Sequence, residues 1–189
     1  MKILVTGATG YIGAHYVKVA AEHGHEVVAT DFNFNQNNIE KYSSQIIDWD
    51  FRKPSPMKMS FDKVVHIGAM GSVPLSVKNP WLYYETNVVG TKNVIDFAEC
   101  DHFVYCSTGS AFDPAASPYA TTKYGGELLT KQFKENHSLV RFYNVCGNNG
   151  FNKLDDKYSH LIRKAAAVAN GKFDTLEIFG TDYDTRDGT

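Results

Sequence analysis

The sequence predicts an α/β protein in which a parallel β-sheet lies between two layers of helices, and three observations support this fold class. Apolar segments of strand length recur along the chain, amphipathic segments of helix length separate them, and a glycine-rich turn directly follows the first apolar segment. Crossover helices bury both faces of a parallel sheet, so its strands are expected to be nearly continuous runs of Val, Ile and Leu. The apolar segments of this chain match that expectation.

The order of elements follows from the same pattern. Strands are predicted at residues 3–5, 26–29, 46–47, 63–67, 103–105 and 139–142. Helices are predicted at residues 12–23, 81–99, 119–136 and 157–170, the last ending at Asn170-Gly171, a common signal for a helix C-terminus. Residues 33–38 and 52–60 are predicted loops because the first is rich in Asn and the second carries two prolines.

Composition limits the classes of function. The 189 residues are 43% hydrophobic and 21% charged, which indicates a folded protein with one substantial core, and we predict a single domain over residues 1–189. The formal net charge of −2 gives no electrostatic reason to expect a nucleic acid or membrane partner, and no apolar run is long enough to predict a membrane span. We therefore expect small-molecule chemistry.

The three cysteines indicate a reducing compartment. Cys100, Cys106 and Cys146 are an odd set without CxxC spacing, and no secretory apolar segment is present. We expect a cytoplasmic protein in which these cysteines are small buried apolar side chains.

The glycine-rich turn predicts a dinucleotide site. Gly7, Gly10 and Gly13 follow the first strand and open the first helix, where they permit a tight turn, close approach of the backbone to a diphosphate, and close packing of helix on sheet. The fold class is thereby refined to a Rossmann-type doubly wound parallel sheet in three α/β/α layers. Asp31 follows the second strand, where a carboxylate accepts hydrogen bonds from ribose hydroxyls and repels a 2′-phosphate, so NAD is predicted rather than NADP.

Three side chains are candidates for catalysis. Tyr119 and Lys123 stand four residues apart at the start of a predicted helix, hence on one face. A phenol with a pKa of about 10 needs a nearby positive charge to act as a base at neutral pH, and the Lys123 ammonium would supply it. Thr108 follows a predicted strand at the carboxyl edge of the sheet, where it could transfer a proton between a sugar hydroxyl and Tyr119.

No metal site is expected. The seven histidines are scattered without ligand spacing, and His66, at the end of an apolar strand, is most simply a buried residue held by hydrogen bonds. Asp182, Asp184 and Asp187 lack the spacing and the distal Glu of a calcium loop.

Six motifs carry a resemblance to a known family, and together they extend along the whole chain: residues 6–13, 65–69, 79–91, 117–123, 141–147 and 178–189. The chain resembles the extended short-chain dehydrogenase/reductases and, within them, the UDP-glucose (UDP-galactose) 4-epimerases. The last segment contributes most to this narrower resemblance. In such enzymes NAD oxidises the sugar at C4, the 4-keto intermediate rotates, and reduction of its other face inverts the centre.

The resemblance implies a role for individual residues. Tyr119 matches the base, Thr108 the residue that assists it, and Lys123 the lysine that holds the nicotinamide ribose. The UDP-sugar would contact Thr108, Tyr119, Asn144, Leu161 and Phe179. NAD would contact Gly7, Gly10, Tyr11, Ile12, Gly13, Asp31, Asn35, Asp50, Phe51, Ile67, Gly68, Ala69, Asn87, Cys106, Tyr119, Lys123 and Tyr143.

The chain also departs from the family pattern. Gly71 replaces a Lys that many epimerases have near the cofactor, and the stretch between Ala111 and Ser117 is much shorter than usual. The sequence stops at Thr189, before the rest of the family's substrate-binding lobe, so residues 145–189 are predicted to be the start of an incomplete lobe.

Two alternatives to an NAD-dependent UDP-hexose 4-epimerase stay open. One is an NAD-binding protein of this family with impaired catalysis. The other is a sugar-nucleotide dehydratase or reductase, although Gly109 and Ser110 occupy the places where a dehydratase has an Asp-Glu pair. By analogy with the superfamily, we expect a homodimer formed through the helices at 81–99 and 119–136.

Overall fold

The computed structural model describes residues 1–32, 39–147, 160–177 and 182–186. The chain forms two compact units, one running from Met1 to Tyr143 and one beginning at Asn144. In the second unit the described helix is α6 (Leu161–Ala169), which carries Leu161 and Ile162 as exposed apolar side chains. Within the part of the chain that the structure describes, no helix combines the length and apolar character needed to cross a membrane.

The first unit contains a six-stranded parallel sheet, as the sequence predicts. Its strands lie in the order β3-β2-β1-β4-β5-β6, so the chain starts in the middle and winds outward in both directions. They are β1 (Lys2–Thr6), β2 (Glu26–Asp31), β3 (Gln45–Asp48), β4 (Met59–His66), β5 (Ala98–Thr108) and β6 (His137–Phe142). This order confirms the doubly wound, Rossmann-type fold.

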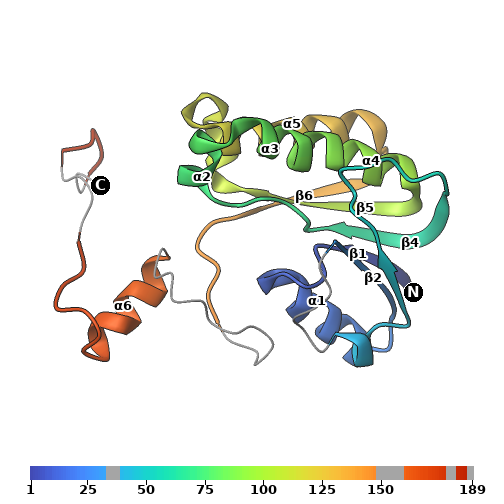
Figure 1. Cartoon of the computed structure of the whole chain (residues 1–189), viewed down its shortest axis with the longest axis horizontal. Helices are drawn as coiled ribbons and strands as arrows, with labels where there is room; N and C mark the ends of the chain where they lie inside the picture. Colours follow the sequence, from blue (N-terminus) through green and yellow to red (C-terminus); the bar gives the residue numbers. More distant parts are fainter. Residues whose placement is uncertain (33–38, 148–159, 178–181, 187–189) are drawn as a thin grey trace. The chain divides into compact units, whose positions relative to one another are not determined.

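Helices cover both faces of the sheet, which makes the three layers (Figure 1). On one face, α1 (Tyr11–Glu22) packs its small residues Ala14, Val17 and Ala20 against alternate side chains of β1 and β2. On the other, α4 (Gly90–Phe97) packs apolar side chains against the alternate residues of β1, β2 and β4. Because successive side chains of a strand point to opposite faces, the same strands contribute apolar residues to the core on each face of the sheet.

The register of the central strands sets the position of the site. Thr6 of β1 pairs with His66 of β4, which pairs with Tyr105 of β5. β1 and β4 end at these positions, and β5 continues past Tyr105 to Thr108 toward the same carboxyl edge of the sheet. β1 and β5 are two strand spacings, about 10 Å, apart. The glycine turn after β1 and the polar end of β5 consequently belong to one edge.

The predicted helix at 81–99 is wrong in two respects. The structure has three pieces there: α3 (Pro80–Tyr84), a π-helical turn η2 (Glu85–Val89) and α4, which ends at Phe97. The residues that follow, Ala98–His102, already belong to β5, whose polar beginning hides the strand signal. The π-turn places Asn87 inward, where its side chain bonds to Met70 and Thr122, and this tertiary contact has no periodic sequence signal.

Other boundaries also differ from the prediction. β4 begins at Met59, inside the predicted loop 52–60, and Ile67 lies beyond its end. The short helix α2 (Val73–Lys78) was not predicted, because six residues are too few to show a helical period; Ser72 caps it and Pro74 stands in its first turn. The predicted loop 33–38 and residues 157–159 of the predicted last helix lie outside the described residues.

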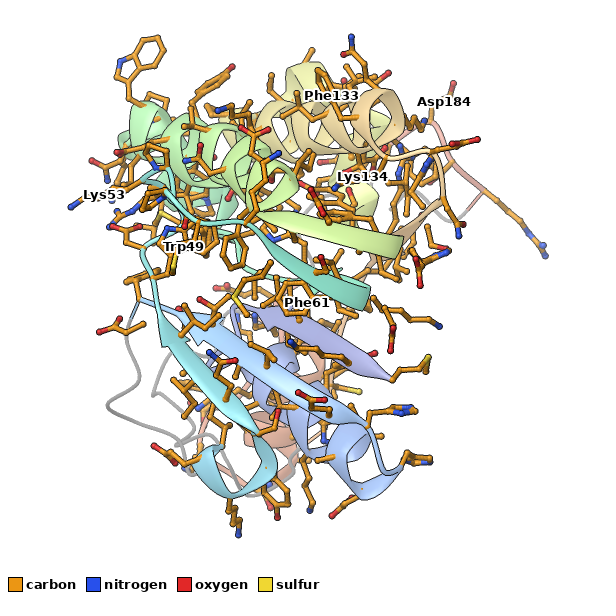
Figure 2. The ribbon with its side chains drawn as sticks, turned by 90° about the vertical axis from the view of Figure 1, so that its right-hand side faces the viewer. Trp49, Lys53, Phe61, Phe133, Lys134 and Asp184 are labelled. Atoms are coloured by element: carbon orange, nitrogen blue, oxygen red, sulfur yellow. The ribbon has the colours of Figure 1, made fainter. Side chains whose placement is uncertain are left out.

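α5 (Pro118–Phe133) ends three residues before its predicted end at 136. Lys134 leaves the helix in an extended conformation and its ammonium donates to the carbonyl of Ala98 at 2.7 Å, above the ring of Phe103. Figure 2 shows Phe133 and Lys134 at this end of the helix. A side-chain contact with the beginning of β5 thus ends the helix where local sequence would let it continue.

The prediction that all three cysteines are buried holds only in part. Cys106 is buried, Cys100 is half-buried and Cys146 is exposed. Cys146 comes after the last strand, where no apolar pattern surrounds it, so its exposure has a local reason.

α5 approaches β5 closely at one glycine. A β-carbon on Gly126 would overlap the phenol of Tyr105, which is fully buried and donates to the carbonyl of Lys123 at 3.3 Å. The adjacent Gly125 would instead place a β-carbon 3.3 Å from the Cγ2 methyl of Val88. Only Gly126 is therefore required for the helix to lie this close to the strand.

We expect Gly126→Ala to destabilise the fold by about 1–3 kcal/mol, because the buried ring has no room to move. Gly125→Ala on the same helix serves as the matched control, and we expect it to be neutral or to stabilise by up to about 1 kcal/mol through helix propensity. Urea denaturation of both variants measures the difference. Equal stability of the two would contradict the close approach of α5 to β5.

Candidate active site

The glycine turn has the geometry of a diphosphate cradle. Gly7 has φ +66°, and a β-carbon there would lie 2.6 Å from the Cα of Gly68 in the loop after β4. A β-carbon on Gly13 would overlap the carbonyl oxygen of Gly7. Gly10 is the N-cap of α1 and brings no side chain to the first turn of that helix, whose N–H groups have no acceptors within the helix. The space and the positive end of the helix dipole suit a phosphate group.

Asp31 lies against this turn. Its Oδ2 accepts hydrogen bonds from the backbone N–H of Thr9 at 3.1 Å and from the Thr9 hydroxyl at 2.7 Å, while Oδ1 accepts from the N–H of Phe32 at 2.8 Å. A carboxylate at the end of β2 is thus joined to the glycine turn after β1. The predicted ribose-binding acid and the predicted phosphate turn are brought together.

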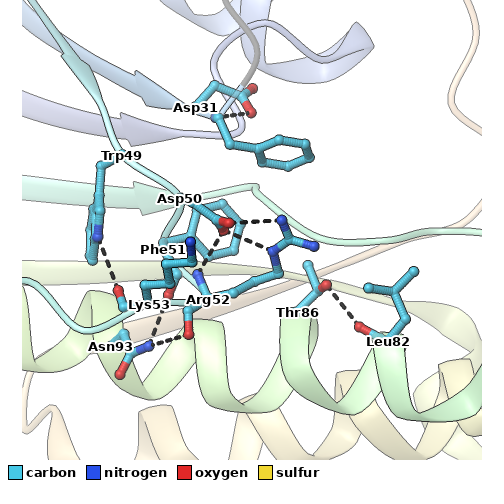
Figure 3. A network of polar contacts seen from close by, with 10 residues as sticks. Asp31, Trp49, Asp50, Phe51, Arg52, Lys53, Leu82, Thr86 and Asn93 are labelled. Carbon is cyan, nitrogen blue, oxygen red and sulfur yellow. Dashed lines mark hydrogen bonds and ion pairs between the residues drawn. The ribbon is translucent and has the colours of Figure 1, made fainter.

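A second carboxylate, Asp50, is paired with an arginine that the sequence analysis missed. Arg52 donates from Nε to Oδ1 of Asp50 at 2.8 Å and from Nη2 to Oδ2 at 2.7 Å (Figure 3). Its guanidinium also lies over the ring of Phe32, 5.2 Å from the centroid. The hydrogen bond from Arg52 holds the pKa of Asp50 below its usual value. The neighbouring Phe51 points its ring into the core, so only its backbone could contact a ligand.

His66 is buried and held by hydrogen bonds, as predicted. The N–H of Gly68 donates to the Thr6 hydroxyl at 3.2 Å, and that hydroxyl contacts Nδ1 of His66 at 2.6 Å. Nε2 of His66 contacts the hydroxyl of Thr91 at 3.0 Å, which donates to the carbonyl of Asn87. This chain of donors assigns the His66 proton to Nε2, and burial lowers its pKa to about 3, so the ring is neutral at physiological pH.

The three predicted catalytic side chains converge at the end of β5. Thr108 is its last residue, and its side chain lies near enough to the Tyr119 phenol to lower the pKa of that phenol. Lys123, one helical turn after Tyr119, is buried and donates from Nζ to the carbonyl of Cys106 at 2.6 Å. Ser117 caps α5 through the N–H of Ala120, which fixes where this helix begins.

The electrostatic state of this group follows from burial. Burial raises the pKa of the Tyr119 phenol, and the hydrogen bond from Thr108 offsets part of that rise. Burial lowers the pKa of Lys123 to about 8, although Cys106 and Glu127 favour its charged form. Near pH 7 Lys123 is therefore largely an ammonium and Tyr119 a neutral phenol. The ring of Tyr83 packs edge-on against Tyr119, with 6.4 Å between centroids.

The remaining predicted contacts are placed as follows. Tyr143 is exposed, and its ring lies against Gly109, beside Thr108. Asn87 is buried with its amide bonded to Met70 and Thr122. Tyr11 and Ala69 are exposed, Ile12 and Ile67 are half-buried, and Gly68 and Cys106 are buried at the edge of the sheet.

Of the predicted substrate residues, Thr108 and Tyr119 belong to this group and to the first unit. Asn144 and Leu161 belong to the second unit, and both are exposed. Asn35 and Phe179 lie outside the described residues. Among the residues that are described, no cluster of three or more His, Cys, Asp or Glu could hold a metal ion.

In addition to Arg52, sequence reasoning missed two polar side chains of the site, Tyr83 and Glu127. Tyr83 accepts a hydrogen bond from the N–H of Ser72, and Glu127 is bonded to Ser107 and Arg141. The available signal for Glu127 was its spacing, four residues after Lys123 on the same helix face, and for Arg141 a charge inside an otherwise apolar strand.

Comparison with known proteins agrees with this geometry. The NAD dependent epimerase/dehydratase family matches residues 3–188. A UDP-glucose 4-epimerase of Halalkalibacterium halodurans is 32% identical over all of this chain and 65% of its own length. Among the curated relatives first matched, this chain spans 65% to 68% of their lengths.

Solved structures of similar proteins have the same fold. A UDP-glucose 4-epimerase of Stenotrophomonas maltophila, with bound NAD and formylated UDP-arabinopyranose, superposes with a TM-score of 0.81 at 27% identity, covering all of this chain and 68% of that one. The Brucella ovis UDP-glucose 4-epimerase in complex with NAD gives 0.77 at 26% identity, covering all of this chain and 66% of that one. Because the family match extends over nearly the whole sequence and the fold and glycine turn agree with it, this chain belongs to the NAD dependent epimerase/dehydratase family.

Proposed function

We propose that this chain binds NAD and interconverts UDP-glucose and UDP-galactose by 4-epimerisation, in galactose metabolism. The observation that carries the proposal is the group formed by Thr108, Tyr119 and Lys123 at the same sheet edge as the glycine turn. The names of its relatives support the choice of reaction.

The chain's residues fit NAD. Gly7 and Gly13 let the turn pack closely against the loop after β4 and against α1, since a β-carbon at either position would meet backbone. Gly10 brings no side chain to the N-terminus of α1, where a diphosphate would bind. Asp31 lies at the turn with a charge that suits ribose hydroxyls and opposes a 2′-phosphate. The proposed cofactor contacts are those of the sequence analysis, with Phe51 contributing through its backbone.

Tyr119 is the proposed base. Bound NAD supplies the oxidant for C4 and a positive ring that favours the phenolate. Tyr119 takes the proton of the sugar 4-hydroxyl, directly or through the neighbouring Thr108 hydroxyl. The Lys123 ammonium, held on the carbonyl of Cys106, adds a second positive charge that lowers the cost of ionising a buried phenol.

The proposed substrate contacts extend beyond the first unit. In addition to Thr108 and Tyr119, we assign Asn144, Leu161 and Phe179 to the UDP-sugar. Residues 1–189 would then form one NAD-binding domain, in which 145–189 begin a substrate-binding lobe.

We further propose a cytoplasmic homodimer formed through the segments 81–99 and 119–136, in which the helical parts are α3, η2, α4 and α5. Support comes from exposed apolar side chains on these segments, among them Trp81 (80% exposed), Val89, Leu128 and Phe133. The three cysteines are free thiols, which suits a reducing compartment. Analytical ultracentrifugation of the purified chain distinguishes a dimer from a monomer.

A second candidate is an NAD-binding protein without catalysis. The observation that favours it is that the glycine turn and Asp31, which suit NAD, come together within the first unit by themselves. Calorimetry separates the candidates, because binding of NAD with no binding of UDP-glucose would favour the second.

We expect Tyr119→Phe to reduce conversion of UDP-galactose to UDP-glucose by ~10²–10⁴-fold, because the phenylalanine cannot take the proton. NAD affinity should change little. Tyr124→Phe on the same helix is the matched control and should keep its turnover. A coupled assay for UDP-glucose measures all three proteins, and equal turnover of Tyr119→Phe and the parent would refute the assigned base.

We expect Asp31→Asn to weaken NAD binding by ~10–100-fold, because hydrogen bonds to a charged acceptor contribute about 1.5–3 kcal/mol. The preference for NAD over NADP should fall as well, since the repelling charge is gone. Asp48→Asn is the control, because Asp48 pairs with Asp31 in register but ends the neighbouring strand. Titration calorimetry with both dinucleotides decides, and unchanged affinities in Asp31→Asn would exclude the assigned ribose contact.

A further inference from the structure

Glu127 is a carboxylate with no exposed surface in the middle of α5. Its Oε1 accepts hydrogen bonds from the Ser107 hydroxyl at 2.5 Å and from Nε of Arg141 at 2.7 Å, and its Oε2 accepts from Nη2 of Arg141 at 2.6 Å. The Arg141 guanidinium lies over the ring of Phe112, 4.2 Å from its centroid. Glu127 is thus held by three donors from two strands.

The carboxylate stays ionised inside the protein. Burial alone would raise the pKa of Glu127, but the hydrogen bonds from Arg141 and Ser107 outweigh burial and bring it below its usual value. A planar guanidinium that donates two parallel hydrogen bonds fixes the orientation of the carboxylate as well as its charge. Glu127 therefore places a fixed negative charge at one point of the helix.

Glu127 and its two partners, Ser107 and Arg141, are next to the proposed catalytic residues on α5 and β5 and on the paired strand β6. Glu127 follows Lys123 by one helical turn on α5, Ser107 precedes Thr108 on β5, and Arg141 pairs with Ser107 in the register of β5 and β6. The contact between Lys123 and the carbonyl of Cys106 is a second attachment of the same helix to the same strand end.

We propose that Glu127 is a positioning residue, which with Ser107 and Arg141 holds the Tyr119–Lys123 face of α5 against Thr108 and supports the charge of Lys123. The positioning of Tyr119 and Thr108 for turnover rests on the proposed function, whereas the link to the charge of Lys123 does not. A carboxylate that only anchored the fold would contribute to stability alone.

The titratable groups around Lys123 determine how strongly its charged form is favoured. The titratable groups that face it are Cys106 and Tyr105 on β5, His66 on β4 and Glu127 on its own helix. His66 is neutral and burial raises the pKa values of Tyr105 and Cys106 well above neutrality. Glu127 is consequently the carboxylate among these groups that favours the ammonium near pH 7.

Two variants test the proposal. Glu127→Gln keeps the shape of the side chain and removes its charge, and Ser107→Ala removes one donor but leaves the ion pair with Arg141 intact. We expect both to lower kcat by about tenfold or more, with KM changed less than about twofold, because the reacting groups lose alignment while the substrate contacts remain. In Glu127→Gln the pKa of Lys123 should fall by about half a unit or more, since the supporting charge is lost.

The control and the second readout keep the outcomes distinct. Ser138→Ala removes a comparable hydrogen bond, between Ser138 and His102 at 2.9 Å, at the other end of the β5–β6 pair and should change neither kcat nor the Lys123 titration. The Lys123 pKa is followed by NMR of ε-carbon-labelled lysine, assigned with Lys123→Met, and this measurement needs neither NAD nor turnover.

If the unmodified chain does not turn over, the proposed function fails, while a lowered Lys123 pKa in Glu127→Gln still supports the role of Glu127. If Glu127→Gln and Ser107→Ala unfold at lower temperature but keep kcat and the Lys123 pKa, Glu127 is a structural anchor and the proposal is wrong. If Glu127→Gln does not fold, Ser107→Ala decides alone, and an unchanged kcat in that variant overturns the proposal.

Discussion

The alignment of β1, β4 and β5 is the constraint on which the site depends. Thr6, His66 and Tyr105 occupy paired positions across the three strands. A slip of one residue would turn each of these side chains to the opposite face of the sheet and separate the glycine turn from the end of β5. The hydrogen bonds of His66 to Thr6 and Thr91 oppose such a slip, because they join β1, β4 and α4 through one neutral ring.

Polar groups buried around this sheet edge hold the surrounding helices in place. The Thr6–His66–Thr91 chain fastens α4, Lys123 and the Glu127 network fasten α5, and Asn87 fastens the loop after β4. Among the described residues, no buried side-chain nitrogen or oxygen lacks a hydrogen-bond partner. An unpaired buried polar group is costly, so each network permits one arrangement of its elements and excludes nearby alternatives.

Local signals were sufficient for most of the architecture and for the two ends of the site. The strand runs, the glycine turn, Asp31 and the Tyr119–Lys123 spacing were all predictable, because each follows from short-range geometry. The split of the helix at residues 81–99 and the polar beginning of β5 were not, since tertiary contacts of Asn87 and pairing with β4 determine them. The sequence did not predict the roles of Arg52, Tyr83 and Glu127 for the same reason. Each forms a hydrogen bond with a residue of another segment, or lies in a loop where no periodic pattern exists.

The central claim is that the glycine turn and the phenol of Tyr119 serve one dinucleotide. A crystal structure of the chain with NAD tests this most directly. We expect the diphosphate on the backbone of residues 7–13, the adenosine ribose on Asp31, and the nicotinamide ring beside Tyr119 and Lys123. A dinucleotide held at the turn whose nicotinamide points away from Tyr119, or one bound elsewhere on the chain, would contradict it.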